Sequence, residues 1–218
     1  MIREFSIVFQ NADRLLAGLA NTVLLAAFGL LLSLVLGGLL SVLLMSESKL
    51  AAFPARALVD AMRCIPFLLL AYLVYYALPS IGLNFDNWTS GLLAIVIYNA
   101  GYMAEILRGV WMQLPRETID AATAFGFHGR KLFMRIILPQ VVLTAIPMIG
   151  NQAIQVIKDT AFLMIIAVPE LTHAASSIQS KYYVPFAAFI CAVALYWAMC
   201  GVIEFAVHRV EKIADARR

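Results

Sequence analysis

The chain has 218 residues, of which 63% are hydrophobic and only 13% are charged, and its formal net charge is +3. A soluble domain of ordinary composition carries about 25% charged residues. The composition therefore excludes a soluble globular protein, and the small positive charge does not indicate nucleic acid binding. We expect an integral membrane protein in contact with lipid.

Uncharged runs divide the chain into five candidate membrane spans. They are Leu15–Ser46, Cys64–Phe85, Asn87–Ala104, Ile136–Ile157 and Tyr182–Ile203. Each run has about the roughly 20 apolar residues that a helix needs to cross a bilayer. Lipid offers no hydrogen-bond partners to open backbone, so segments this long are predicted to be helices. The predicted fold is an all-α membrane protein, a bundle of five transmembrane helices.

Lysine and arginine fall mainly on one side of this bundle, because successive loops alternate sides. That side receives Lys49, Arg56, Arg63, Arg108, Arg116, Arg130, Lys131, Arg135, Arg209, Lys212, Arg217 and Arg218. The other side receives only Arg3, Arg14 and Lys181. Basic loops are retained in the cytoplasm. We therefore predict an outside N-terminus and a cytoplasmic C-terminus.

The same pattern predicts the organisation of the chain. Residues 1–14 are expected to form an outer interfacial segment, and residues 15–210 a single transmembrane domain. A cytoplasmic loop at 109–138 interrupts this domain, and residues 211–218 form a cytoplasmic tail.

Small residues recur every four positions in the first span, at Gly29, Ser33, Gly37 and Ser41. Residues at this spacing share one helix face and allow another helix to approach closely. The stripe predicts a packing surface, either within the subunit or between two subunits.

Polar residues also share faces in two later spans. Asn99, Tyr102 and Glu105 lie on roughly one face of the third span, where Glu105 either pairs with Arg108 at the interface or contributes to a path. The fourth span carries Asn151, Gln155, Lys158 and Asp159. Polar groups in hydrocarbon are costly, so this second stripe must face protein or water. It is either the lining of a path or a structural seam.

Catalytic and metal-binding motifs do not occur in the sequence. There is no H-E-x-x-H, no G-x-S-x-G and no G-x-x-x-x-G-K-[ST] loop. We therefore predict no catalytic residue, no metal site and no ATP site in this chain. Two alternatives to transport are an intramembrane enzyme that uses Glu105, Asp159 and a histidine, and a membrane scaffold that transports nothing.

One charged segment, Arg116–Gln140, stands between the third and fourth spans. Glu117–Phe125 contains good helix formers with acidic residues in its first turn, and Gly126 is typical of a helix stop. A second short basic segment, Gly129–Ile137, ends at Leu138-Pro139. The pattern predicts a helix–turn–helix elbow on the cytoplasmic side.

This elbow resembles the "EAA" loop of bacterial ABC-importer permeases. That signature reads EAA, three residues, Gly, nine residues, Ile, one residue and Leu-Pro. Here Asp120-Ala121-Ala122 stands for EAA, followed by Gly126 and by Ile136-Ile137-Leu138-Pro139 at the same spacing. Asp120 replaces the glutamate and keeps its charge.

Three further segments are similar to the polar amino-acid subfamily of these permeases. Tyr98–Gly109 resembles N-x-A-Y-x-A-E-x-x-R-G, Ile157–Phe162 resembles K-D-T-S-L, and Arg63–Pro66 resembles R-G-T-P. Ala161 and Phe162 replace the Ser and Leu of the second motif. The resemblance covers roughly residues 20–210.

The resemblance implies a type I importer permease of the bacterial inner membrane. Its solutes are polar amino acids or related compounds, including basic amino acids and opines. Its partners are separate ABC ATPase subunits, which carry the ATP and Mg, a second identical or homologous permease, and an extracytoplasmic solute-binding protein. In such a system ATP binding drives alternating access, and this chain binds no cofactor of its own.

The resemblance also implies two sets of functional residues. The ATPase-coupling set comprises Glu117, Ile119, Asp120, Ala121, Ala122, Phe125, Gly126, Phe127 and Pro139. The substrate-path set comprises Asn99, Tyr102, Glu105, Asn151, Gln155, Lys158 and Asp159.

Overall fold

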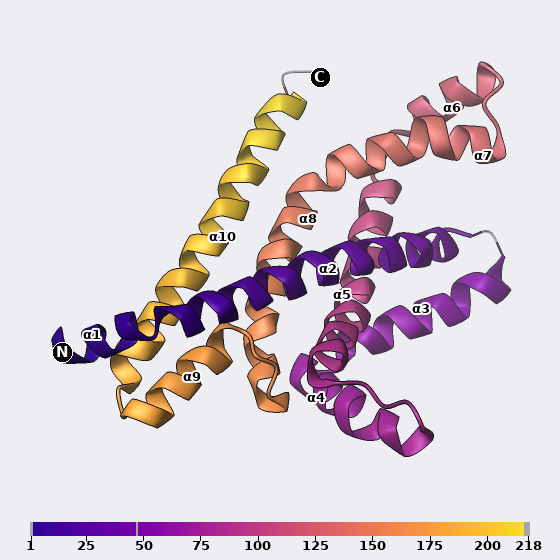
Figure 1. Ribbon diagram of the computed structural model, residues 1–218. Helices are drawn as coiled ribbons and strands as arrows, with labels where there is room; N and C mark the ends of the chain where they lie inside the picture. Colours follow the sequence, from indigo (N-terminus) through magenta and orange to yellow (C-terminus); the bar gives the residue numbers. More distant parts are fainter. Residues whose placement is uncertain (1, 47, 216–218) are drawn as a thin grey trace.

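The computed structural model describes residues 2–46 and 48–215, whose regular structure is helical throughout (Figure 1). The elements in chain order are α1 (Ile2–Gln10), α2 (Ala12–Leu44), α3 (Lys49–Cys64), α4 (Phe67–Tyr72), η1 (Leu73–Ala77), η2 (Leu78–Ile81), α5 (Asn87–Met112), α6 (Arg116–Ala124), α7 (Gly129–Leu132), η3 (Phe133–Ile137), α8 (Leu138–Thr160), η4 (Ala161–Ile166), α9 (Leu171–Tyr182) and α10 (Pro185–Asp215). We call the end of the bundle that carries α6 and α7 the elbow end, and the end that carries α9 the opposite end.

Four stretches of helix in the described part of the chain are long and apolar enough to cross a membrane, and the number is five if a bent pair of helices is counted as one span. The four are α2, α5, the continuous run Gly129–Ile166 and the Pro185–Val210 part of α10. The fifth is α3 together with Phe67–Ile81, which meet at an angle of 103°. The all-helical bundle predicted from the sequence is thereby confirmed.

The predicted second span, Cys64–Phe85, is helical over Phe67–Ile81 and meets α3 at a sharp bend. Pro66 disfavours helical backbone at the residue before it, and Ile65 is extended, with φ −79° and ψ 130°. The helix therefore breaks here, and the charged segment Lys49–Cys64 before the break is also helical. Irregular backbone at membrane depth is tolerated only where protein or a water-filled cavity surrounds it. The backbone at this break should therefore be surrounded by protein or line a water-filled cavity.

The long helix α2 crosses the bundle and packs against α5, α8 and α9 (Figure 1). Its small-residue stripe is buried and faces α5 within the same subunit. A Cβ atom added to Gly29 would lie 2.5 Å from Ile95, and one added to Gly37 would lie 2.5 Å from Met103. Of the two roles left open by the sequence, the stripe takes the one within the subunit.

The helix α9, not expected from the sequence, closes the opposite end of the bundle. Glu170 precedes it, and its carboxylate accepts hydrogen bonds from the backbone N–H groups of Thr172 and His173, at 2.7 and 2.6 Å. The Tyr196 hydroxyl of α10 donates to the same carboxylate at 2.7 Å. Glu170 is fully buried, and burial raises its pKa. The residue caps α9 and ties it to α10.

The two ends of the chain differ in detail from the predicted organisation. The N-terminal segment holds α1 and the first turn of α2, and α10 continues to Asp215 (Figure 1). Arg217 and Arg218, which the sequence places in the cytoplasmic tail, lie outside the described residues.

Candidate functional site

A cluster of amides and one carboxylate lies between α5 and α8, near the middle of α5. Gln152 donates to Asn99 Oδ1 at 2.7 Å, and Gln155 donates to Asp159 Oδ1 at 2.8 Å. Asn99 donates in turn to the backbone oxygen of Ile95 at 3.0 Å. We call Asn99, Gln152, Gln155 and Asp159 the polar cluster. It joins the two polar faces predicted from the third and fourth spans.

Asp159 is the member of the polar cluster whose bonding is incomplete. Its side chain is only 2% exposed, and its Oδ2 atom has no hydrogen-bond partner. A buried acceptor without a partner costs about 1–3 kcal/mol, and more when it is charged. A site that keeps such a group has an acceptor available for a cationic or hydrogen-bonding ligand.

Two tyrosines of α5 adjoin this polar region. The hydroxyls of Tyr98, next to Asn99 in the chain, and Tyr102 are 3.3 Å apart. Tyr102 donates to the backbone oxygen of Arg63 at 3.4 Å, and the Arg63 guanidinium lies 5.6 Å from the centre of the Tyr102 ring. Polar groups thus continue from the polar cluster to the break in the second span.

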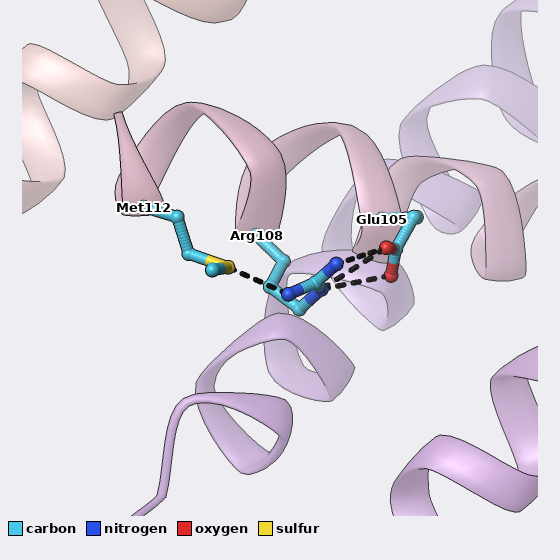
Figure 2. A network of polar contacts seen from close by, with 3 residues as sticks. All are labelled: Glu105, Arg108 and Met112. Atoms are coloured by element: carbon cyan, nitrogen blue, oxygen red, sulfur yellow. Dashed lines mark hydrogen bonds and ion pairs between the residues drawn. The ribbon is translucent and has the colours of Figure 1, made fainter. Parts of the chain in front are cut away.

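Glu105 and Arg108 form an ion pair one turn further along α5, as Figure 2 shows. Arg108 Nε donates to both carboxylate oxygens, at 3.1 and 3.0 Å, and a terminal nitrogen of the same guanidinium also contacts Glu105. Another terminal nitrogen contacts Met112 Sδ at 2.6 Å. The sequence left two roles open for Glu105. The structure has it paired with Arg108, outside the polar cluster.

The polar residues of the fourth span divide between the outside of the single subunit and its interior. Asn151, Lys158 and the polar-cluster member Gln155 are exposed, whereas Asp159 is buried. Adjacent helix residues face different directions, so Lys158 and Asp159 do not pair. The stripe predicted as one feature therefore has an outward part and an inward part.

The elbow has the predicted helix–turn–helix form. The helix α6 ends at Ala124, and Gly126 adopts φ +86°, a left-handed conformation that glycine takes at little steric cost. Ala122 faces inward, whereas Ala121 and Phe125 face out, and Phe125 is 84% exposed. Pro139 lies in the first turn of α8, so the elbow runs directly into the helix that carries Asp159.

Other predicted coupling residues lie around the same surface. Glu117, Asp120 and Gly126 are exposed, and Ile119 and Phe127 are half-buried. The surface of α6 and its following turn therefore exposes one phenylalanine beside small residues and carboxylates.

The predictions missed three residues of the polar region. The predicted substrate-path set contains neither Gln152 nor Tyr98, and the sequence places Arg63 among the basic residues of the cytoplasmic side. Gln152 lies one turn before Gln155, and Tyr98 one turn before Tyr102, so helical spacing was an available signal for both. Nothing in the local pattern placed Arg63 beside Tyr102, because the break in the second span brings them together.

Comparison with known proteins decides the family. A family model described as "Binding-protein-dependent transport system inner membrane component" matches residues 29–213. The chain belongs to this family. The permease is 30% identical over 207 residues to "Probable glutamine ABC transporter permease protein GlnM" of Bacillus subtilis (strain 168), covering 95% of this chain and 96% of that protein.

Two further comparisons agree with this assignment. The permease is 33% identical over 201 residues to "Octopine transport system permease protein OccM" of Rhizobium meliloti, covering 88% of this chain and 82% of the relative. The "Crystal structure of an amino acid ABC transporter with histidines" matches with a TM-score of 0.89 and 25% identity, covering 95% of this chain and 97% of that chain.

The family fixes the general role of the molecule. It is a multi-pass inner membrane component of a binding-protein-dependent ABC importer, which confirms the transporter prediction over the intramembrane enzyme and the scaffold. ATP hydrolysis belongs to a partner subunit, and the system includes a solute-binding protein.

Proposed function

We propose that this permease moves polar amino acids or related solutes, including basic amino acids and opines, into the cytoplasm by alternating access. The relatives named for glutamine and octopine transport support this solute class. Such solutes carry both a cationic ammonium group and several hydrogen-bonding atoms, which match a carboxylate and amides.

The observation that carries the proposal is the polar cluster with its unpartnered Asp159 Oδ2. A carboxylate and three amides at the middle of a membrane bundle cannot form hydrogen bonds with lipid. A polar network with an unsatisfied member also has a higher free energy than an apolar core. A transported cationic group completes the network, so Asn99, Gln155 and Asp159 form part of the solute path. Tyr102, Glu105, Asn151 and Lys158 line its surroundings.

The exposed polar stripe of α8 supports a dimer of permeases. Asn151, Gln155 and Lys158 cannot face hydrocarbon, because an exposed charge or amide at membrane depth costs several kcal/mol at the upper end of estimates. A second permease, identical or homologous, covers this face and leaves a water-filled path between the subunits.

The elbow is the coupling device in this proposal. The surface of α6, with Ala121, Phe125 and Asp120, docks on the partner ATPase, which holds ATP and Mg. Because α7, η3 and α8 are continuous, a displacement of the elbow reaches Asp159 along one helix. The elbow end is then cytoplasmic, together with the C-terminus, and the opposite end meets the binding protein.

The test is uptake by the complete importer in liposomes, with the ATPase enclosed and the binding protein outside. The panel is L-arginine, L-histidine, L-glutamine and octopine. We expect ATP-dependent uptake of at least one solute, and Asp159→Asn lowers uptake of the cationic solutes about tenfold or more. Asp86→Asn, in the connection before α5, is the control with normal uptake.

Uptake of none of the panel would contradict the solute class. Unchanged affinity and rate in the Asp159→Asn importer for every transported solute would remove Asp159 from the path.

A further inference from the structure

Arg63 stands at the break of the second span and against the middle of α5. Its side-chain stem lies over Gly101, where an added Cβ atom would come within 3.2 Å of Arg63 Cγ. Its guanidinium lies over the ring of Tyr102, and its backbone oxygen accepts from the Tyr102 hydroxyl. These contacts hold the cation beside the polar region.

The Arg63 guanidinium lacks the partner that a cation at membrane depth requires. Its Nε atom is buried without a hydrogen bond, and it forms no ion pair within the part of the chain that the structure describes. Glu105, one turn after Tyr102 on α5, is occupied by Arg108, which binds both oxygens of that carboxylate. The stacking on Tyr102 contributes only about 0.5–2 kcal/mol.

An arginine in this state is prepared for a carboxylate. The guanidinium is planar, stays charged and presents its N–H groups as a fork that matches a carboxylate in two places. Stacking on a ring holds the plane of the fork, so little side-chain freedom is lost when the ligand binds.

We propose that Arg63 receives the carboxylate of the transported solute, on the elbow side of Asp159. This inference rests on the proposed function and deepens it. It assigns the two charged ends of the solute to two opposite charges of the protein, with Asp159 for the cationic group and Arg63 for the carboxylate.

Tyrosine hydroxyls beside Arg63 can bind the rest of the solute. The hydroxyls of Tyr98 and Tyr102 are 3.3 Å apart, and Tyr102 also donates to the backbone oxygen of Arg63. A solute whose carboxylate lies on Arg63 can therefore form hydrogen bonds to this pair of hydroxyls.

The test measures binding to the permease–ATPase complex in nanodiscs without the binding protein, so that selection by that protein does not contribute. Two matched pairs of probes serve: L-arginine with L-argininamide, and L-glutamine with its α-carboxamide. The amide keeps the size of the acid and removes its negative charge. We expect the wild type to bind the acid about tenfold or more tightly than the amide.

The variants then locate the charge that makes this distinction. Arg63→Gln is expected to bind acid and amide with affinities within about twofold of each other. Arg63→Lys keeps the charge without the fork and should give an intermediate ratio. Arg56→Gln is the matched control, because Arg56 is also an arginine of α3, yet it is exposed. It should keep the wild-type ratio.

The ratio of the two affinities separates this role from a structural one, which would weaken both probes alike. A wild-type ratio in Arg63→Gln overturns the inference, and a wild-type ratio in Arg63→Lys does so if the glutamine variant does not assemble. If the wild type binds the acids without preferring them to the amides, the inference fails and the proposed function stands. If the complex neither binds nor transports any of the solutes, both fail.

Discussion

Gly37 shows how closely the packing of this bundle depends on single residues. It lies where α2 crosses α5, and an added Cβ atom would approach Met103 Cβ to 2.5 Å, Ala100 O to 2.8 Å and Ala104 N to 2.9 Å. Two of these atoms are backbone, so they cannot move aside by a change of rotamer. The two helices would have to separate.

We therefore expect Gly37→Ala to destabilise the permease by about 1–3 kcal/mol, the usual cost of overpacking. Gly38→Ala is the control, because an atom added there would meet only Leu107 Cδ1, at 3.9 Å. Thermal denaturation of the purified complex in detergent measures both. Equal denaturation midpoints for the two variants would contradict the prediction and show that α2 and α5 can move apart here at little cost.

Asp159 and Lys158 show which side-chain directions can be predicted from the sequence and which cannot. Helical spacing predicts that neighbours on a helix point apart, and the structure has Asp159 buried and Lys158 exposed. Which of the two faces the interior depends on the rotation of α8 about its axis. That rotation is set by packing against α2, α5 and α10, which no local pattern contains.

At the scale of elements, the elbow was predictable and the second span was not. The elbow is specified locally, by the acidic first turn of α6, the stop at Gly126 and the proline in the first turn of α8. The break after Cys64 is also marked by a proline, but an uncharged run extends past it and hides it. The helix α9 is short and depends on Glu170, whose partners lie on two different elements.

The exposed face of α6 gives a prediction at this scale. The side chain of Phe125 is 84% exposed, so it contributes little to the packing of the elbow. We expect its contribution to come from contacts with the ATPase. We expect Phe125→Ala to weaken ATPase binding by about 2 kcal/mol or more, roughly thirtyfold, and to leave membrane insertion unchanged. Co-purification at graded ATPase concentrations measures the loss.

The matched control is Phe9→Ala, an exposed phenylalanine on α1 at the opposite end of the bundle. It should bind the ATPase as the wild type does. Normal binding by Phe125→Ala would mean that the docking surface lies elsewhere on the elbow end.

At the scale of the whole molecule, the positions of charges give a prediction of sidedness but none of the site. The sidedness prediction sums over many lysines and arginines, so it depends little on errors in individual helix ends. The polar region instead forms where α3, α5 and α8 come together in the folded bundle. Asn99 and Asp159 were expected from their spans, whereas Arg63 contacts Tyr102 through the packing of α3 against α5.

The sidedness can be tested directly with single cysteines. In a variant without Cys64, Cys191 and Cys200, Asn84→Cys places a thiol on the exposed connection before α5, and His128→Cys places one on the exposed turn of the elbow. Successive spans carry these two positions to opposite ends of the bundle (Figure 1). Because the elbow end holds most of the basic residues, it should be cytoplasmic.

In spheroplasts, a membrane-impermeant maleimide should therefore label Asn84→Cys at once and His128→Cys only after permeabilisation. The reverse order would invert the molecule in the membrane and place α6 where no cytoplasmic ATPase can reach it.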